Sequence, residues 1–255
     1  MTKRFIITIY LFFIGIMPLL ATHDPIFAEA GAELEAPSSE HWLGTDHLGR
    51  DVWSRLVIGG RRTLGAAILA TGIAIGGGLT FSALHQSRWF RFPAGVLLDA
   101  LLAFPALLIA LVVRTLLAGS WLSLALAISL AGIAPYARVA TDAIQIAWNA
   151  PHIEGARAIG AGTMRIFAFH LIPTALPTLT SFGSIIFGWM ILYQAALAFL
   201  GLGGSNTQPD WAVMLDQGRG YLEQAPLLVM CPGGMIAVCV WLANTLADDW
   251  RSIRR

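Results

Sequence analysis

Lysine is almost absent from this 255-residue sequence: Lys3 is the only one, and the other fifteen basic residues are arginines. A P-loop that binds nucleotide phosphates needs a lysine directly after its glycines, and Lys3 lies in no such setting. The sequence also contains no His-Glu-x-x-His and no Gly-x-Ser-x-Gly motif. We therefore expect no ATP hydrolysis by a P-loop, no catalytic residue and no cofactor bound by this chain.

Charged residues of both signs are scarce, at 12%, whereas apolar residues make up 56% and mean hydropathy is +0.69. Soluble domains have about a quarter of their residues charged, so the composition indicates a multi-pass α-helical membrane protein. The net charge of +1 gives no indication of a nucleic-acid partner. Cys231 and Cys239 would lie about 12 Å apart on one helix, too far for a disulfide, and we expect both to be buried hydrophobes.

Long stretches without Asp, Glu, Lys or Arg predict the membrane topology, because a bilayer core needs roughly 20 apolar residues of helix. We predict a single membrane domain over residues 1–255 with six spans, near residues 5–21, 64–84, 94–117, 121–140, 174–199 and 226–247. The first span has some features of a signal peptide, with Ala28-Glu29-Ala30 as a possible cleavage site. Its apolar run is long for a signal, and the site lies far from its end, so we expect an uncleaved helix.

The arginines and Lys3 in the connections predict the orientation. With the N-terminus inside, ten basic residues lie inside and five outside, so both termini are expected in the cytoplasm. Residues 22–62 and 201–225 are then outer segments, and residues 141–172 form an inner loop. The five outer basic residues are an exception that the charge count does not explain: Arg50, Arg55, Arg61, Arg62 and Arg219.

Few polar side chains fall inside the expected spans. Asp99 and Arg114 lie within or at the edge of the third one, where a charge costs about 3 kcal/mol at the centre and so marks a candidate functional residue. The alternative, which we favour, is that both lie near opposite membrane surfaces, where they snorkel or face partner helices. The loop residues His41, Asp46 and His47 lack ligand spacing, and we expect no metal site there.

The inner loop contains a short helix signal. Pro151 suits the first turn of a helix, Glu154 suits its positive end and Gly160 suits its stop. The residues between are small, which would let another surface approach closely. A plain interfacial connector helix explains the composition equally well.

In this loop Glu154-Gly155-Ala156 is followed by Gly160 and then by Leu171-Ile172-Pro173. The spacing resembles the "EAA" loop of ABC importer permeases: Glu-Ala-Ala, three residues, Gly, nine residues, then Ile-x-Leu-Pro. Gly155, His170 and Ile172 depart from that pattern. The resemblance implies that these residues couple the chain to a cytoplasmic ATPase: Glu154, Gly155, Ala156, Arg157, Gly160 and Pro173.

A second run, from His41 to Leu56, is similar to the segment before the second span in C-type subunits of the dipeptide, oligopeptide and nickel permease family. Pro209-Asp210-Trp211 and Pro232-Gly233 resemble the last outer loop and last span of that family. The resemblance covers nearly the whole chain from Trp42 onward and accounts for the outer arginines. The motif residues of the first run are Gly44, Thr45, Asp46, Gly49, Arg50, Asp51 and Arg55.

The resemblance implies the all-α fold of a type I ABC importer permease, with six transmembrane helices and a cytoplasmic coupling helix, in a bacterial inner membrane. It also implies a heterodimer with a homologous B-type permease, two cytoplasmic ATPases that bind ATP and Mg²⁺, and an extracytoplasmic solute-binding protein. The substrate would be a di- or oligopeptide, nickel or a metal–chelator complex. A self-sufficient secondary transporter or channel is the main rival, but such folds commonly carry internal repeats and midplane polar sites, which we do not find. An integral membrane enzyme lacks its catalytic set here.

Overall fold

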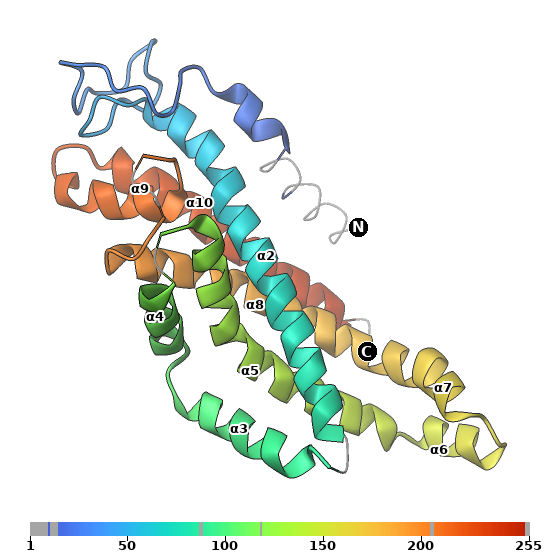
Figure 1. The fold of residues 1–255 in the computed structure, drawn as a ribbon. Helices are drawn as coiled ribbons and strands as arrows, with labels where there is room; N and C mark the ends of the chain where they lie inside the picture. Colours follow the sequence, from blue (N-terminus) through green and yellow to red (C-terminus); the bar gives the residue numbers. More distant parts are fainter. Residues whose placement is uncertain (1–9, 11–14, 87–88, 118, 205–206, 253–255) are drawn as a thin grey trace.

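A computed structural model describes residues 10, 15–86, 89–117, 119–204 and 207–252. In this part of the chain the regular structure is helical, apart from one isolated β-bridge between Thr45 and Asp51 (Figure 1). The four long helices are α2 (Val52–Gln86), α5 (Trp121–Trp148), α8 (Ile172–Phe199) and α10 (Leu227–Ser252). The shorter elements are η2 (Met17–Leu20), α3 (Arg91–Ala103), α4 (Ala106–Leu116), α6 (Pro151–Ala158), α7 (Thr163–Ile166), the π-helical η3 (Phe167–Leu171), α9 (Trp211–Gly218) and η4 (Arg219–Tyr221).

Each of the four long helices is long and apolar enough to cross a membrane. They overlap four of the expected spans: 64–84, 121–140, 174–199 and, apart from its first residue, 226–247. The helices α3 and α4 would add a fifth crossing if the bent pair is counted as one span. Most of the expected first span, 5–21, lies outside the described residues, so the count of six remains a prediction.

The expected span 94–117 is not one straight helix. Its residues form α3 and α4, whose axes are bent by 92° at the break. At that break Phe104 is extended, with ψ 139°, and Pro105 has φ −58° and ψ 125°. A proline has no N–H for the helical ladder and disfavours the helical conformation of the residue before it. The apolar run that predicted a single span conceals this break.

The core is built where α5 packs along α2 and where α8 packs against α5 and α10. Small residues of α2 allow the close approach: Ala66, Ala67, Ala70 and Ala74 are fully buried. A β-carbon on Gly78 would lie 2.9 Å from the backbone nitrogen of Ala137 in α5. Both cysteines are free, as expected, with Cys239 buried and Cys231 partly buried.

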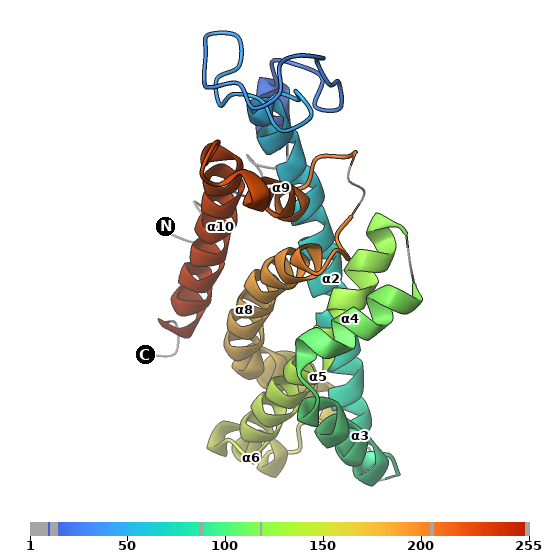
Figure 2. The ribbon, with the colours of Figure 1, turned by 90° about the vertical axis from the view of Figure 1, so that its left-hand side faces the viewer.

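The two loop regions of interest lie at opposite ends of the molecule. Residues 22–51 and α9 gather at the N-terminal end of α2, whereas α6 lies at the far end, where α5 stops and α8 begins (Figures 1 and 2). Helix α2 begins at Val52, so the last part of the expected outer segment 22–62 is helical. Asp51 directly precedes this helix and accepts the N–H of Ser54 at 2.7 Å, as an N-capping residue does.

Candidate functional site

The short helix expected in the inner loop is present as α6 and stops where the sequence predicted. Pro151 occupies its first turn. At its end, Gly160 has φ +79° and its N–H donates to the carbonyl of Arg157 at 2.9 Å. The N–H of Ala161 donates to the carbonyl of Ala156 at 3.0 Å. This pair of bonds is a Schellman motif, which satisfies the last carbonyls of a helix and favours glycine at its left-handed position.

One face of α6 is buried against the chain itself. Ile153 is fully buried and Ala156 is 7% exposed. These two residues, three positions apart, share a helix face and join a cluster from α5, α7, η3 and α8: Ala143, Ala147, Ile166, Leu171 and Ala175. We expected Ala156 on the face that another subunit approaches, and this orientation is wrong, because the side chain points into the core of its own loop.

The opposite face of α6 is exposed. Glu154 and Gly155 are exposed, and Ile159, directly after the helix, is 86% exposed. Arg157 is also exposed, but its guanidinium lies 4.2 Å from the centre of the Trp148 ring and donates to the carbonyl of Trp148 at 3.4 Å. The exposed side of α6 therefore includes Glu154, Gly155 and Ala158, with Arg157 at its border and Ile159 directly after it.

The start of α8 is fixed to α6. The Nε2 atom of His152 lies 3.2 Å from Oγ1 of Thr174, which itself donates to the carbonyl of His170 at 2.7 Å. Pro173 lies in the first turn of α8, directly after the π-helical η3. The buried cluster also includes Ala175 of α8, so α6 and the start of α8 pack on the same core.

The outer family motif forms a buried ion network around Asp46. Its carboxylate accepts a hydrogen bond from Nε of Arg50 at 2.8 Å and lies 3.5 Å from Nε of Arg55. Both guanidinium groups also donate to Oε1 of Gln217 in α9, at 3.3 and 3.4 Å, and Arg55 donates to the carbonyl of Pro25. Arg50 and Arg55, two of the outer arginines that the charge count did not explain, are thus buried and paired. The count of basic residues in the connections does not distinguish buried, paired arginines from exposed ones.

The remaining motif residues fold the outer segment. Gly44 and Gly49 have φ +76° and +72°, and a β-carbon on either would lie 2.2 Å from a carbonyl oxygen, of Glu35 or Glu29 respectively. Thr45 is buried and its Oγ1 accepts the N–H of Glu35 at 2.9 Å. Backbone geometry therefore requires glycine at positions 44 and 49, and these residues together with Thr45 hold the outer segment in its fold.

The motif at the start of α9 packs on α2. Asp210 caps α9 by accepting the N–H of Ala212 at 2.9 Å. Burial raises the pKa of the Asp210 carboxyl, an effect that the N–H groups at the start of α9 oppose. Trp211 is fully buried; its indole donates to the carbonyl of Leu56 at 2.7 Å and its backbone N–H to Oγ1 of Thr63 at 3.0 Å. The two distant parts of the family resemblance thus form one packed unit.

The two charges expected inside the third span have different environments. Arg114 is 6% exposed and donates to the carbonyls of Leu202 at 2.9 Å and Gly203 at 2.7 Å, as well as to Ser123. Asp99 has a 71% exposed side chain, 3.4 Å from Arg138. Arg114 therefore ties α4 to the turn after α8 and to the start of α5, whereas Asp99 forms an exposed pair.

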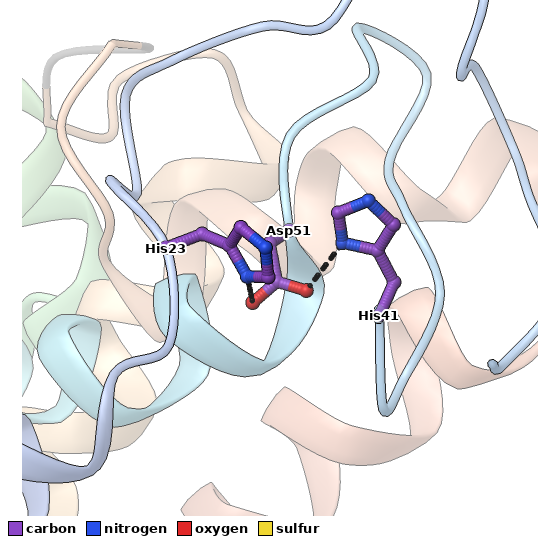
Figure 3. A group of neighbouring side chains, drawn as sticks. All are labelled: His23, His41 and Asp51. Carbon is purple, nitrogen blue, oxygen red and sulfur yellow. Dashed lines mark hydrogen bonds and ion pairs between the residues drawn. The ribbon is translucent and has the colours of Figure 1, made fainter. Parts of the chain in front are cut away.

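The structure does not bring together the three loop residues weighed as metal ligands. Asp46 pairs with arginines, and the ring of His47 stacks on Tyr221 with centroids 5.3 Å apart. His41 instead lies beside His23 and Asp51 (Figure 3). Sequence reasoning missed this group because its members lie far apart along the chain, and only the fold of residues 22–51 makes them neighbours.

The helix pattern and the short α6 define a multi-pass membrane subunit, and comparison with known proteins identifies its class. Residues 68–252 match the family described as the binding-protein-dependent transport system inner membrane component. The dipeptide transport system permease protein DppC of Alkalihalophilus pseudofirmus is 31% identical over 248 residues, covering 96% of this chain and 82% of the relative. The glutathione transport system permease protein GsiD of Pectobacterium atrosepticum is 33% identical over 219 residues, covering 85% of this chain and 73% of the relative.

This chain belongs to that family and is a permease subunit of an ABC importer in the inner membrane. Solved structures support the fold. An inward-facing MetNI methionine ABC transporter aligns with a TM-score of 0.66 and 19% identity, covering 80% of this chain and 98% of that chain. An amino acid ABC transporter with histidines aligns with a TM-score of 0.63 and 17% identity, covering 76% of this chain and 91% of that chain.

Proposed function

We propose that this chain is the C-type permease of an importer for short peptides and that α6 couples it to a cytoplasmic ATPase. The relatives, named as a dipeptide permease and a glutathione permease, support a peptide substrate. The partners are a homologous B-type permease, which completes the translocation path, two ATPases that bind ATP and Mg²⁺, and an extracytoplasmic solute-binding protein. The ATPases supply the energy, in keeping with the missing P-loop lysine.

The observation that carries the coupling role is the division of α6 into two faces. Ile153 and Ala156 are buried against the permease, so the helix is held in place without a partner. Glu154, Gly155 and Ile159 are exposed on the other side. An isoleucine side chain with 86% exposure gains most when a partner pocket buries it. Ile159 is therefore the anchor that seats in a cleft of the ATPase.

Movement of the ATPases would reach the translocation path through α8. The His152–Thr174 contact and the shared buried cluster make α6 and the start of α8 move together. Coupling requires such a continuous physical connection between the two sites. Closure of the ATPases around ATP would then tilt α8 and change which side of the membrane the path faces.

The arrangement of the two ends supports the proposed topology. If α6 meets cytoplasmic ATPases, residues 22–51 lie at the opposite, extracytoplasmic end and face the solute-binding protein (Figures 1 and 2). Both termini are then cytoplasmic. Cysteines introduced at Ser38 and Ser252 test this: a membrane-impermeant thiol reagent should label position 38 in intact cells. Labelling of position 252 from outside would contradict the topology.

The coupling role is tested in the whole importer, expressed with its partners. Ile159→Asp should abolish co-purification of the ATPase and ATP-dependent uptake of a labelled dipeptide, because a charge would have to enter the cleft. Ile159→Leu, which keeps the apolar side chain, should retain both. Full association and uptake in Ile159→Asp would overturn the role of α6. Competition by glutathione or by nickel identifies the substrate class, and uptake by this chain alone under an ion gradient would favour the secondary-transporter alternative.

A further inference from the structure

Three side chains from separate parts of the outer segment converge beside the first turn of α2. They are His23, His41 and Asp51, and one ligand atom from each lies within 4.8 Å of the others (Figure 3). Nδ1 of His41 lies 3.0 Å from Oδ1 of Asp51, and Nδ1 of His23 lies 3.9 Å from Oδ2 of the same carboxylate. We propose that this group binds a divalent transition-metal ion of the zinc type, which fixes residues 22–51 to α2.

The donor set suits such an ion. Two imidazole nitrogens and one carboxylate oxygen are a ligand combination that zinc takes in proteins, with a further position left open. A tetrahedral ion with bonds of about 2.0–2.1 Å holds its ligand atoms about 3.4 Å apart, and one ligand atom from each of the three residues lies within 4.8 Å of the others. Small rotations of the two rings would complete the geometry.

Residues around the group contact the two histidines, as residues around a metal site commonly do. Nε2 of His41 lies 3.9 Å from Oε2 of Glu29, so a carboxylate is near the ring nitrogen that does not face Asp51, where metal-binding histidines commonly have one. His23 is held through its backbone N–H, which donates to Oγ of Ser54 at 2.9 Å. The N–H of Thr22 donates to the same oxygen at 3.1 Å. The backbone at His23 is therefore anchored to the first turn of α2, and Nδ1 of its ring lies 3.0 Å from Oγ1 of Thr22.

Charge and access favour a bound cation. The side chain of Asp51 is 1% exposed, and within the described part of the chain its ion-pair partners are the two histidine rings. Capping of α2 compensates part of this buried negative charge. A buried carboxylate is stable only when the rest of its charge is also compensated, and a dication bound by the two imidazoles and the carboxylate would do so. His23, 38% exposed, leaves the group open to solvent.

A hydrogen bond between His41 and Asp51 alone would explain only half of the arrangement. The ring of His23 lies 4.9 Å from that of His41, tilted by 39°, on the same carboxylate. A simple staple of the outer segment needs no second imidazole at this place. The cation would join residues 23, 41 and 51 and so cross-link the segment that the Asp46 network already anchors.

The test uses the full chain in detergent, purified with a tag that lacks histidine and stripped with a chelator. Zn²⁺ is titrated against a competing chromophoric chelator, and Co²⁺ reports the ligand geometry by its visible absorption. Wild-type protein should bind one ion, and His23→Ala and Asp51→Asn should each weaken binding by more than about tenfold, a loss that even an outer-shell change causes. Asp51→Asn keeps an oxygen that caps α2. His152→Ala, at the opposite end, is the matched control and should bind as wild type does.

Thermal unfolding provides a second readout. Zn²⁺ should raise the unfolding temperature of the wild-type and His152→Ala proteins, because an ion that binds only the folded state stabilises it. It should leave His23→Ala unchanged, while that variant and the wild type unfold at the same temperature in chelator, as the exposure of His23 predicts. Absence of Zn²⁺ binding by the wild type would overturn the proposal, as would equal affinity in all four proteins.

Discussion

The indole of Trp211 lies so close to Gly60 that a β-carbon at position 60 would come within 2.6 Å of its Cζ2 atom. The neighbouring Gly59 similarly faces the backbone of Asp210, where a β-carbon would lie 3.2 Å from the nitrogen. Two glycines in α2 thus provide the surface on which the first turn of α9 rests. The contact joins two segments about 150 residues apart in a chain of 255 and holds the outer end of the permease together.

Gly60→Ala should therefore destabilise the protein. Because Trp211 is fully buried and hydrogen-bonded, it cannot move aside easily, and overpacking of this kind costs about 1–3 kcal/mol. Gly72→Ala is the matched control in the same helix, since a β-carbon there meets nothing within 4 Å; it should stabilise α2 by up to about 1 kcal/mol. Thermal unfolding in detergent measures both. Equal unfolding temperatures for the two variants would contradict the packing argument.

A second prediction concerns Gly160. Its φ of +79° is costly for a β-branched residue but acceptable for asparagine. We expect Gly160→Val to distort the end of α6 and to reduce both ATPase co-purification and uptake severalfold, while Gly160→Asn keeps most of both. A β-carbon at this position meets nothing within 4 Å, so the difference comes from backbone strain alone. Identical behaviour of the two variants would show that the turn does not position the coupling face.

The sequence predicted local features well where one residue type determines them. Pro151 and Gly160 marked the start and stop of α6 because each imposes a backbone geometry at its own position. The orientation of Ala156 was missed, since small size suits a partner contact and a tightly packed loop core equally. The bend at Pro105 was missed because a window average of hydropathy does not register a single break.

Contacts between distant residues were beyond the reach of the sequence. The positive-inside count treated Arg50 and Arg55 as exposed charges, whereas both are buried around Asp46. Nothing local to His23 or His41 indicates that they approach Asp51, because that neighbourhood depends on how residues 22–51 fold back over α2. Prediction failed wherever the property of a residue depended on the folding of an irregular segment.

The two charged residues of the α3–α4 region should differ sharply in their effect on stability. Arg114→Met removes the donors to Leu202 and Gly203 and should destabilise by at least about 2 kcal/mol, because buried carbonyls lose their partner. Asp99→Asn should change stability by less than about 1 kcal/mol, since its pair with Arg138 is exposed. Thermal unfolding of both variants tests this contrast. A larger loss in Asp99→Asn would indicate a partner that the isolated chain does not contain.

The last prediction concerns pH and His47. Burial lowers the pKa of this imidazole; Asp46 opposes the shift, and Arg50 and Arg55 add to it. The unfolded chain, with a histidine pKa of about 6.5, therefore takes up the proton before the folded chain as the pH falls. The contribution of His47 to stability is thus complete above about pH 6.5 and is lost as the pH falls from there towards the lowered folded-state pKa.

His47→Gln removes this titration while keeping a polar side chain beside Tyr221. We expect the unfolding temperature of the wild type to fall more between about pH 7.5 and about pH 5.5 than that of the variant. The two proteins share every other residue, so the difference between the two slopes isolates position 47. Equal slopes would mean that the ring is as accessible to protons in the folded outer segment as in the unfolded chain, and that its stacking on Tyr221 does not exclude the charged form.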